Sequence, residues 1–336
     1  MKTQILKTNE IQKAADIIKR GGLVAMPTET VYGLAADALN GEAVAKIFKA
    51  KGRPMDNPLI VHIADIRQLD MLVREVPEKA RILAEKFWPG PLTIILPKSD
   101  IIPVEVSAGL DTVAVRYPSH PTAQELIRLS CPLAAPSANL SGSPSPTSAA
   151  HVYDDMCGRI EAVIDGGECK VGVESTVITL AGDVPRLLRP GGVTLEQRRE
   201  AIGEVILDSA VLDPLEEGKQ AASPGMKYKH YSPKADVKLI KGPAERFAEY
   251  VNSHKEEGAA VLCYDEEKSS LDVPMITVGG ASDQETQANK LFSALRTADK
   301  EGYRILYAHC PEKKGIGLAL YNRMIRAAGF EVIELE

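Results

Sequence analysis

The sequence contains few cysteines, few aromatic residues and no long hydrophobic run. Its five cysteines are widely scattered and form no Cys-x-x-Cys pair, which argues against a structural zinc site or a disulfide framework. Aromatic residues make up only 5% of the chain. No apolar stretch approaches the roughly 20 residues of a membrane helix, and the first residues lack the apolar core of a signal peptide. We therefore expect a cytoplasmic protein that does not enter a membrane.

Charge of one sign does not dominate either. The formal net charge of −6 argues against a protein that coats nucleic acid non-specifically. The phosphate-binding pattern GxxxxGK[ST] is absent, and we find no defensible Ser/His/Asp triad, catalytic carboxylate pair or cluster of metal ligands. A hydrophobic content of 44% and a charged content of 26% are ordinary for a folded domain. The length of 336 residues allows two domains, each with its own core.

The pattern of helices and strands changes along the chain. Residues 1–205 mix both without a regular alternation, which predicts an α/β domain with a mixed, twisted sheet. In residues 235–336 strands alternate with helices, which predicts a small Rossmann-like domain with a parallel sheet. Residues 206–234 contain several proline steps and little apolar periodicity, so we expect a basic linker. The segment 27–37 is expected to be a loop between a buried strand and a helix.

Positive charge is concentrated in the stretch from residue 43 to residue 62. Four cations and no acid precede Asp56, namely Lys46, Lys49, Lys51 and Arg53. They fall where a helix that stops at Gly52 meets a buried strand, and crowded cations repel one another unless an anion lies among them. A phosphate or carboxylate site is therefore the leading interpretation. A solvated basic helix face explains the first two cations equally well, whereas Lys51 and Arg53 stand at the end of the helix.

Other candidates lie at strand ends and in polar loops. Residues 136–148 hold six Ser or Thr and no charge, which suits the binding of phosphate oxygens, although a flexible polar linker is the alternative. Arg189 ends a strand beside Pro-Gly-Gly, as a phosphate clamp would. Arg116 lies in an apolar strand, and a buried guanidinium needs an anionic partner. That partner is either a group within the protein, such as Asp111 or Glu174, or a substrate carboxylate, which is the sharper alternative.

Two further features carry less weight. His62 ends an apolar strand, where a core histidine with satisfied hydrogen bonds is the default and a polar contact at a cleft rim is the alternative. Gly315-Ile316-Gly317 precedes the last helix but lacks the full GxGxxG pattern. The candidates as a whole are cations, hydroxyls and amides. Such groups suit phosphoryl or adenylyl transfer, which depends on positioning and electrostatics.

These residues resemble a known family. Lys51-Gly52-Arg53 together with Ser137-Ala138-Asn139 is similar to the Lys-x-Arg … Ser-x-Asn signature of the YrdC-like threonylcarbamoyl-AMP synthases. The segments PTETVYGLAAD, KGRPMDNPLIVHI, FWPGPLT, APSAN, ESTV and LRPG resemble that family in the same order, over most of residues 10–200. The linker and the second domain resemble its longer members. The resemblance implies an enzyme that combines L-threonine, bicarbonate or CO₂ and ATP into threonylcarbamoyl-AMP and releases pyrophosphate, for the threonylcarbamoyladenosine modification of tRNA.

The resemblance also implies roles for individual residues, with Lys51 and Arg53 as the catalytic pair. The ATP side would comprise Lys51, Arg53, Asn57, Thr112, Ser137, Asn139, Ser145, Arg189 and Tyr231. The threonine side would comprise Thr30, His62, Arg116 and Ser175, with Arg116 against the carboxylate. No protein-bound cofactor or metal is implied, and Mg²⁺ would accompany ATP. A downstream tRNA-modifying transferase would receive the product, and weak contact with tRNA is a further expectation.

The linker and the alternatives complete the expectations. Residues 222–232 fall in a basic, acid-free stretch, and we expect them to close over the ATP site as a lid that excludes water. The competing class is an RNA-binding or ribosome-associated factor that uses the same basic cleft, against which the net charge and the few aromatic residues argue. A carbamoyl-transfer enzyme that uses carbamoyl phosphate is a second alternative, but it would leave Arg116 without its threonine carboxylate.

Overall fold

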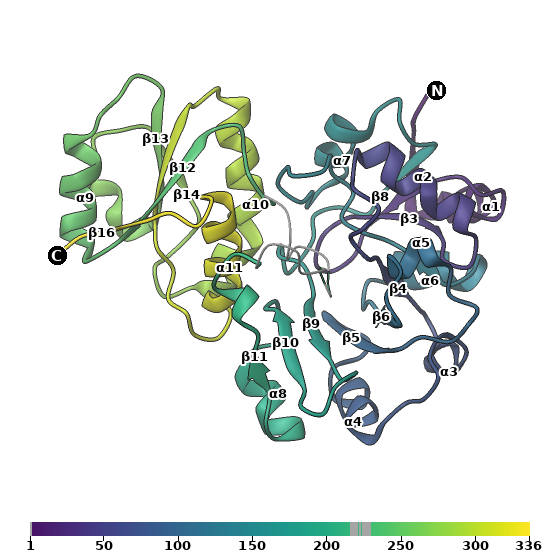
Figure 1. The fold of residues 1–336 in the computed structure, drawn as a ribbon. Helices are drawn as coiled ribbons and strands as arrows, with labels where there is room; N and C mark the ends of the chain where they lie inside the picture. Colours follow the sequence, from purple (N-terminus) through teal and green to yellow (C-terminus); the bar gives the residue numbers. More distant parts are fainter. Residues whose placement is uncertain (1, 216–220, 222, 224–229) are drawn as a thin grey trace. The chain divides into compact units, whose positions relative to one another are not determined.

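The computed structural model describes residues 2–215, 221, 223 and 230–336 (Figure 1). The chain forms two compact units, the first from residues 1–141 and 145–227 and the second from residues 142–144 and 228–336. Most of the expected lid lies outside the described residues. Within the described part, no helix is long and apolar enough to cross a membrane.

The first unit is built on one mixed sheet, as the sequence predicts. Its eleven strands follow the order β1-β8-β2-β3-β7-β4-β6-β5-β9-β10-β11, with both parallel and antiparallel neighbours. The strands are β1 (Gln4–Lys7), β2 (Val24–Met26), β3 (Gly33–Asp37), β4 (Ile60–His62), β5 (Leu92–Pro97), β6 (Thr112–Arg116), β7 (Leu133–Ala134), β8 (Ala162–Asp165), β9 (Thr176–Thr179), β10 (Arg186–Arg189) and β11 (Ile206–Leu207).

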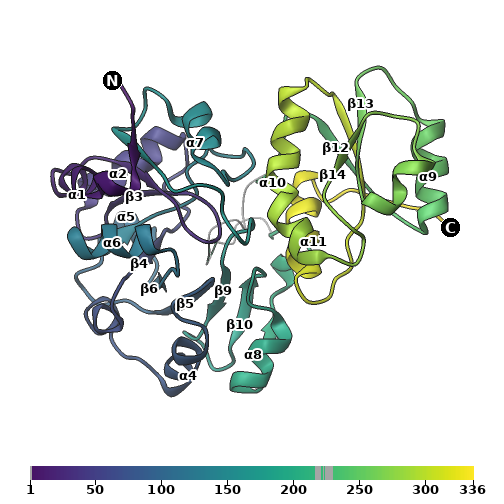
Figure 2. The ribbon, with the colours of Figure 1, turned by 180° about the vertical axis from the view of Figure 1, so that it is seen from behind.

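Helices cover this sheet and join its strands. They are α1 (Ile11–Lys19), α2 (Gly41–Lys51), α3 (Leu69–Leu72), α4 (Glu78–Phe87), α5 (Val104–Ser107), α6 (Pro121–Leu129), α7 (Ala149–Met156) and α8 (Leu195–Ile202). Three 3₁₀ turns also occur, η1 (Thr8–Glu10), η2 (Ile66–Gln68) and η3 (Ser209–Val211). Helix α8 packs against α4 beside β9 and β10 (Figure 2).

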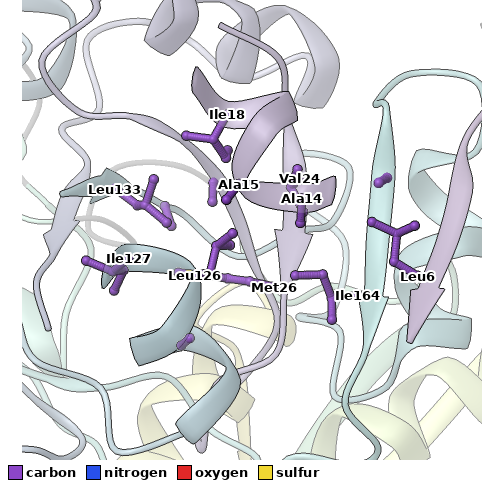
Figure 3. Packing of buried hydrophobic residues seen from close by; sticks show 14 of the residues in the cluster. Leu6, Ala14, Ala15, Ile18, Val24, Met26, Leu126, Ile127, Leu133 and Ile164 are labelled. Carbon is purple, nitrogen blue, oxygen red and sulfur yellow. The ribbon is translucent and has the colours of Figure 1, made fainter. Parts of the chain in front are cut away.

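A hydrophobic core lies between α1, α6 and the strands beneath them (Figure 3). The apolar face of α1 contributes Ala14, Ala15 and Ile18, whose spacing of one and three residues places them on one side of a helix. Leu126 of α6 and Met26 of β2 meet them, and each of these side chains is fully buried. This core holds β2 in place and thereby positions the loop that follows it.

Local signals fix both ends of α2. The side chain of Asn40 accepts a hydrogen bond from the Ala43 N–H at 3.1 Å, which caps the first turn. Gly52 has a φ of 64°, a left-handed conformation that ends the helix with little strain only for glycine. The helix therefore stops at Lys51, and the chain turns so that Arg53 enters the loop before β4.

The structure differs from the expectations in two segments. Residues 33–37 form β3, which pairs antiparallel with β2 and β7, instead of continuing a loop. Most of this strand is buried on both faces, so its sequence lacks the alternation that marks a half-exposed strand. Residues 206–211 also belong to the first unit, because β11 pairs with β10 and η3 buries Ala210 and Val211. The connection between the domains thus begins later than residue 206.

The second unit has the parallel α/β architecture that its alternating strands and helices predict. Five parallel strands follow the order β14-β13-β15-β12-β16. They are β12 (Asp236–Lys241), β13 (Ala259–Cys263), β14 (Met275–Thr277), β15 (Ile305–His309) and β16 (Val332–Glu334). Helix α9 (Ala244–Ser253) lies on one face, and α10 (Gln284–Lys300) and α11 (Gly317–Ala327) lie on the other (Figure 1). The 3₁₀ turn η4 (Asp265–Ser270) follows β13.

Ile18→Ala tests the core of the first unit. The side chain is fully buried, and a truncation of this kind lowers the free energy of unfolding by about 2–5 kcal/mol. Trp88 is the only tryptophan and lies in the first unit, so its fluorescence during urea unfolding follows that unit. Ile5→Ala is the control, because Ile5 is 55% exposed and should change stability by about 0.5 kcal/mol or less. Equal effects of the two changes would contradict this assignment of the core.

Candidate active site

Lys51 joins the end of α2 to the Ser-x-Asn segment. Its side chain is only 2% exposed, and its Nζ donates to the carbonyl oxygens of Ser137 and Asn139, the latter at 2.6 Å. In return, the Ser141 N–H donates to the Lys51 carbonyl at 2.9 Å. The structure thus brings the two halves of the signature into direct contact, although they are far apart in the sequence.

Arg53, Asn57 and Thr112 lie at the amino ends of β4 and β6. Nη2 of Arg53 donates to the carbonyls of Asn57 and Pro58 at 3.3 and 3.2 Å. The register of the parallel pair sets Ile60 opposite Ala114, so Thr112 stands at the same end of the sheet as Pro58. Asn57 is 1% exposed, yet among the described residues neither its amide nitrogen nor its amide oxygen has a hydrogen-bond partner. A buried amide without partners is unfavourable by about 1–3 kcal/mol, which is expected where a ligand supplies them.

A second group, which contains the predicted residues His62 and Arg116 and also Thr93, occupies one row across the sheet. His62 of β4 lies opposite Arg116 of β6, which in turn lies opposite Thr93 of β5. Residues paired in register project to the same face of a sheet. All three are nearly or fully buried. The row therefore forms a polar strip within the largely apolar sheet.

Arg116 has a partner that the sequence did not predict. Its Nη2 lies 2.7 Å from Oε1 of Glu29, its Nη1 donates to Oγ1 of Thr30 at 2.9 Å, and its Nε donates to the Gly90 carbonyl at 3.3 Å. The proposed internal partners, Asp111 and Glu174, were wrong. The first is exposed, and the second accepts a short hydrogen bond from Ser145.

The Glu29 carboxylate remains open to a further donor. Burial alone would raise its pKa, but the charge and hydrogen bond of Arg116 outweigh this effect and hold the pKa below its usual value. Glu29 is therefore ionised. Neither of its oxygens makes a well-aligned hydrogen bond within the described part of the chain, despite the short approach of Arg116. A cationic or hydroxyl group of a ligand could occupy this position.

Ser175 connects the row to Arg189. Its Oγ lies 2.8 Å from Oγ1 of Thr93, and Arg189 reaches it from β10, with Nη2 donating to Oγ at 3.1 Å and Nε to the Ser175 carbonyl at 3.0 Å. Gly191 follows Arg189 closely, and a Cβ there would lie 2.5 Å from the backbone of Glu174. The Pro-Gly-Gly turn therefore needs glycine for close packing of the backbone.

The remaining predicted residues are placed as follows. Ser145 is buried in the first unit, where it donates to Glu174. Tyr231 lies in the second unit, where its ring packs against Phe292 at 5.4 Å, so its role toward ATP stays a prediction. Lys46 donates to the Gly21 carbonyl at 2.6 Å, which is a structural role at the end of α1.

His62 is neutral in the folded protein. Burial lowers its pKa to about 3, and the nearby charge of Arg116 acts in the same direction. Its Nδ1–H donates to the Ile60 carbonyl at 3.2 Å, since a carbonyl oxygen can only accept. That contact is compatible with both interpretations of His62, as a core histidine and as a polar contact at the rim of a cleft.

From the sequence, Thr28 and Glu29 are only weak candidates as polar residues of the loop 27–37, and Thr93 is not predicted at all. Thr28 Oγ1 lies 2.9 Å from Thr30 Oγ1, within the loop after β2, and Thr93 bonds Ser175. For Glu29, an acid between two buried segments is a signal of a buried cation nearby. For Thr93, which stands in the apolar run of β5, no comparable signal exists.

The fold and this geometry define an α/β protein whose first unit carries a charged, buried site on one mixed sheet. Residues 16–191 match a family model described as telomere recombination, and residues 193–329 match the model of the threonylcarbamoyl-AMP synthase C-terminal domain. By these matches and the relatives below, the chain belongs to the threonylcarbamoyl-AMP synthase family, which is a family of enzymes.

Curated relatives match almost the whole chain. A threonylcarbamoyl-AMP synthase from Pyrococcus abyssi is 49% identical over 97% of this chain and 96% of its own. One from Bacillus subtilis is 47% identical, with coverage of 98% and 97%. The solved structure of P. abyssi Sua5 complexed with L-threonine superposes with a TM-score of 0.93 at 47% identity and covers 100% of both chains. Escherichia coli YciO, at 24% identity and a TM-score of 0.51, shares the fold over 56% of this chain.

His62→Gln tests the neutral histidine through pH dependence. The folded pKa of about 3 lies below the unfolded value of about 6.5, so the unfolded state binds more protons between these values. Stability should therefore fall as the pH decreases through this window, by up to about 1.4 kcal/mol per pH unit from this residue. The urea midpoint followed by Trp88 fluorescence should fall more steeply between pH 6 and pH 4 in the wild type than in the variant. Parallel curves would contradict the assignment.

Proposed function

We propose that the first unit synthesises L-threonylcarbamoyl-AMP from L-threonine, bicarbonate or CO₂ and ATP, with release of pyrophosphate. The observation that carries this proposal is the separation of two kinds of charge. Near the amino ends of β4 and β6 lie the cation of Arg53 and the buried amide of Asn57, whereas the row of Arg116 presents a cation beside the Glu29 carboxylate. The first arrangement suits a polyanion, and the second suits a zwitterion.

The zwitterion would be threonine. Its carboxylate would lie against Arg116, and its ammonium group would approach the Glu29 oxygens that lack aligned hydrogen bonds. Thr30 and Ser175 would meet the substrate hydroxyl or carboxylate, and His62 would contribute a neutral polar surface. Because the pKa of Glu29 is held low, it is a poor general base and serves to hold the amine rather than to deprotonate it. The binding of L-threonine by P. abyssi Sua5 supports this assignment.

The polyanion would be ATP. Its phosphates, ribose and base would be held by the residues of the ATP side, which are Lys51, Arg53, Asn57, Thr112, Ser137, Asn139, Ser145, Arg189 and Tyr231. The threonine amine adds to CO₂ and loses a proton to give a carbamate. A carbamate oxygen then bonds to the α-phosphorus as the bond to the β-phosphate oxygen breaks, and pyrophosphate leaves with the electron pair. Two anions must approach each other in this step, and the surrounding cations reduce their repulsion.

Magnesium would enter with ATP and not from a site built by the protein. The groups beside Lys51 and Arg53 are cations, amides and carbonyls, and the described part of the chain contains no group of three His, Cys, Asp or Glu side chains placed for a metal. The groups beside Lys51 and Arg53 therefore suit phosphate oxygens, and Mg²⁺ would arrive with the ATP phosphates. The product would pass to a tRNA-modifying transferase in the cytoplasm, with weak tRNA contact as a further expectation.

The names of the relatives support the synthase over an RNA-binding factor. The same names favour threonine over carbamoyl phosphate as the source of the transferred group. The row around Arg116 agrees with this choice, because carbamoyl phosphate has no ammonium group to place against Glu29. A salt-dependent affinity for tRNA without nucleotide turnover would instead support the RNA-binding alternative.

Arg53→Ala tests the phosphate side. Loss of a cation that stabilises the transferring phosphate should lower threonine-dependent pyrophosphate release by about 100-fold or more. Release is measured from ATP and bicarbonate with and without L-threonine. Lys49→Ala is the matched control, because Lys49 is an exposed cation in the last turn of α2, just before Arg53, and the variant should keep nearly full activity. The proposal would be contradicted if the wild type released pyrophosphate without threonine. It would also be contradicted if both variants lost the same fraction of the threonine-dependent release.

Glu29→Gln tests the threonine side. The change should raise the KM for threonine by about 10-fold or more and leave the KM for ATP nearly unchanged, because only one substrate carries an ammonium group. The same change removes the partner of a buried guanidinium and is expected to destabilise the first unit by about 3–5 kcal/mol, so assays belong well below the unfolding temperature. Thr30→Val, which removes a hydroxyl and no charge, provides a second, milder variant. An equal rise in the KM for threonine and the KM for ATP would argue against separate binding sites for the two substrates.

A further inference from the structure

Three polar side chains form a continuous line in the first unit, from β10 to β5. Arg189 of β10 donates from Nη2 to Oγ of Ser175 at 3.1 Å and from Nε to the Ser175 carbonyl at 3.0 Å. Oγ of Ser175 in turn lies 2.8 Å from Oγ1 of Thr93 in β5. All three side chains are buried. Arg189 and Ser175 have proposed roles toward the two substrates, whereas Thr93 has none so far.

This line contains one hydroxyl hydrogen more than its own contacts can use. Thr93 and Ser175 carry one hydroxyl hydrogen each, and only one of these can lie between their two oxygens. The guanidinium of Arg189 can only donate, so it accepts neither hydrogen. Within the described part of the chain, neither hydroxyl has a further hydrogen-bond partner. The second hydrogen therefore needs an acceptor from elsewhere, because buried polar groups are normally paired.

The places of the two hydroxyls indicate which hydrogen remains. Thr93 lies inside β5 and has no exposed surface, whereas Ser175 lies in the connection just before β9 and keeps 2% of its surface exposed. An outside acceptor reaches Ser175 more readily, so Thr93 donates to Ser175. The oxygen of Ser175 then accepts from both Thr93 and Arg189, which uses its two lone pairs. Toward a ligand, the Ser175 hydroxyl can consequently act only as a donor.

The row of Arg116 indicates which ligand group accepts this hydrogen. Thr93 and Arg116 are paired in register on β5 and β6, so their side chains project to the same face of the sheet. Nη2 of Arg116 makes no well-aligned hydrogen bond among the described residues, and it is a second donor at this face. A carboxylate only accepts, and therefore matches two donors. An alcohol would bring a further hydrogen that also needs an acceptor.

We propose that Thr93 is a positioning residue for the amino-acid substrate. By donating to Ser175, it fixes the Ser175 hydroxyl as a donor to the threonine carboxylate, beside Arg116. This inference rests on the proposed synthesis of threonylcarbamoyl-AMP and adds to it a residue that does not itself touch the substrate. The carboxylate of threonine takes no part in bond formation, so its contacts hold the ground state and the transition state equally. Thr93 should therefore affect the KM for threonine and not kcat.

Thr93→Val tests this role, because valine keeps the shape of threonine and removes the hydroxyl. In threonine-dependent pyrophosphate release, the KM for threonine should rise by about 3- to 10-fold, as expected for one lost hydrogen bond. The KM for ATP and kcat should change little, and Thr93→Ser, which retains the hydroxyl, should nearly restore the wild-type KM. Thr3→Val is the matched control. It removes another buried hydroxyl of the first unit, one that donates to the Ile160 carbonyl beside the edge strand β1, and should change neither KM.

A double-mutant cycle shows whether Thr93 acts through Ser175. In a Ser175→Ala background, Thr93→Val should raise the KM for threonine no further, because the hydroxyl that Thr93 orients is already absent. The same rise in both backgrounds would overturn the proposal, since Thr93 would then act independently of Ser175. So would a rise in the KM for threonine that Thr93→Ser does not reverse, which would indicate a packing effect of the substitution.

L-2-Aminobutyrate identifies the oxygen that accepts from Ser175, because it keeps the carboxylate of threonine and lacks the hydroxyl. As a competitor of threonine, it should inhibit Thr93→Val with an inhibition constant about 3- to 10-fold higher than in the wild type. Equal inhibition of both proteins, or of neither, would overturn the assignment to the carboxylate. An unchanged KM for threonine in Thr93→Val would overturn the role of Thr93 alone. A wild type without threonine-dependent release would overturn the proposed function as well.

Discussion

The buried guanidinium of Arg116 is the interaction on which the first unit's site depends. A charge taken out of water needs close partners, and here they come from two separate segments. Glu29 and Thr30 belong to the loop after β2, and Gly90 belongs to the turn before β5. Arg116 therefore ties these segments to β6. The pairing of β6 with β4 and β5 places His62 and Thr93 in the same row as Arg116.

Some buried polar groups of the site have no aligned hydrogen-bond partner among the described residues, and they lie in two distinct places. Beside Arg116 the carboxylate of Glu29 lacks aligned donors, so this part of the site holds one charge of each sign and still has room for polar partners. At the amino ends of β4 and β6, Arg53 donates to two carbonyl oxygens, and within the described part of the chain the Asn57 amide has no hydrogen-bond partner. A neutral pair and a cationic cluster require different ligands. This difference argues for one amino acid and one polyphosphate better than any single residue does.

The sequence predicted those parts of the fold that are encoded locally. Asn40 and Gly52 bound α2 by capping and by a left-handed φ, so Lys51 and Arg53 could be placed at a helix end from sequence alone. Strand β3 was read as a loop because both of its faces are buried and its residues do not alternate. The pairing of Arg116 with Glu29 was missed because it joins segments that are distant in the sequence. The requirement that a buried guanidinium has an anionic partner could be met by several acids of the chain. Only the folded chain selects among them.

Lys51 illustrates why a signature residue can have two tasks. Its Nζ contacts the carbonyl oxygens of Ser137 and Asn139, so much of its donor capacity is directed at the chain itself. The Ser141 N–H returns a bond to the Lys51 carbonyl, which fixes the loop to the end of α2 from both sides. Lys51 thus positions the Ser-x-Asn segment, whatever charge it also offers to a phosphate. This contact brings the two halves of the signature together at the carboxyl end of α2.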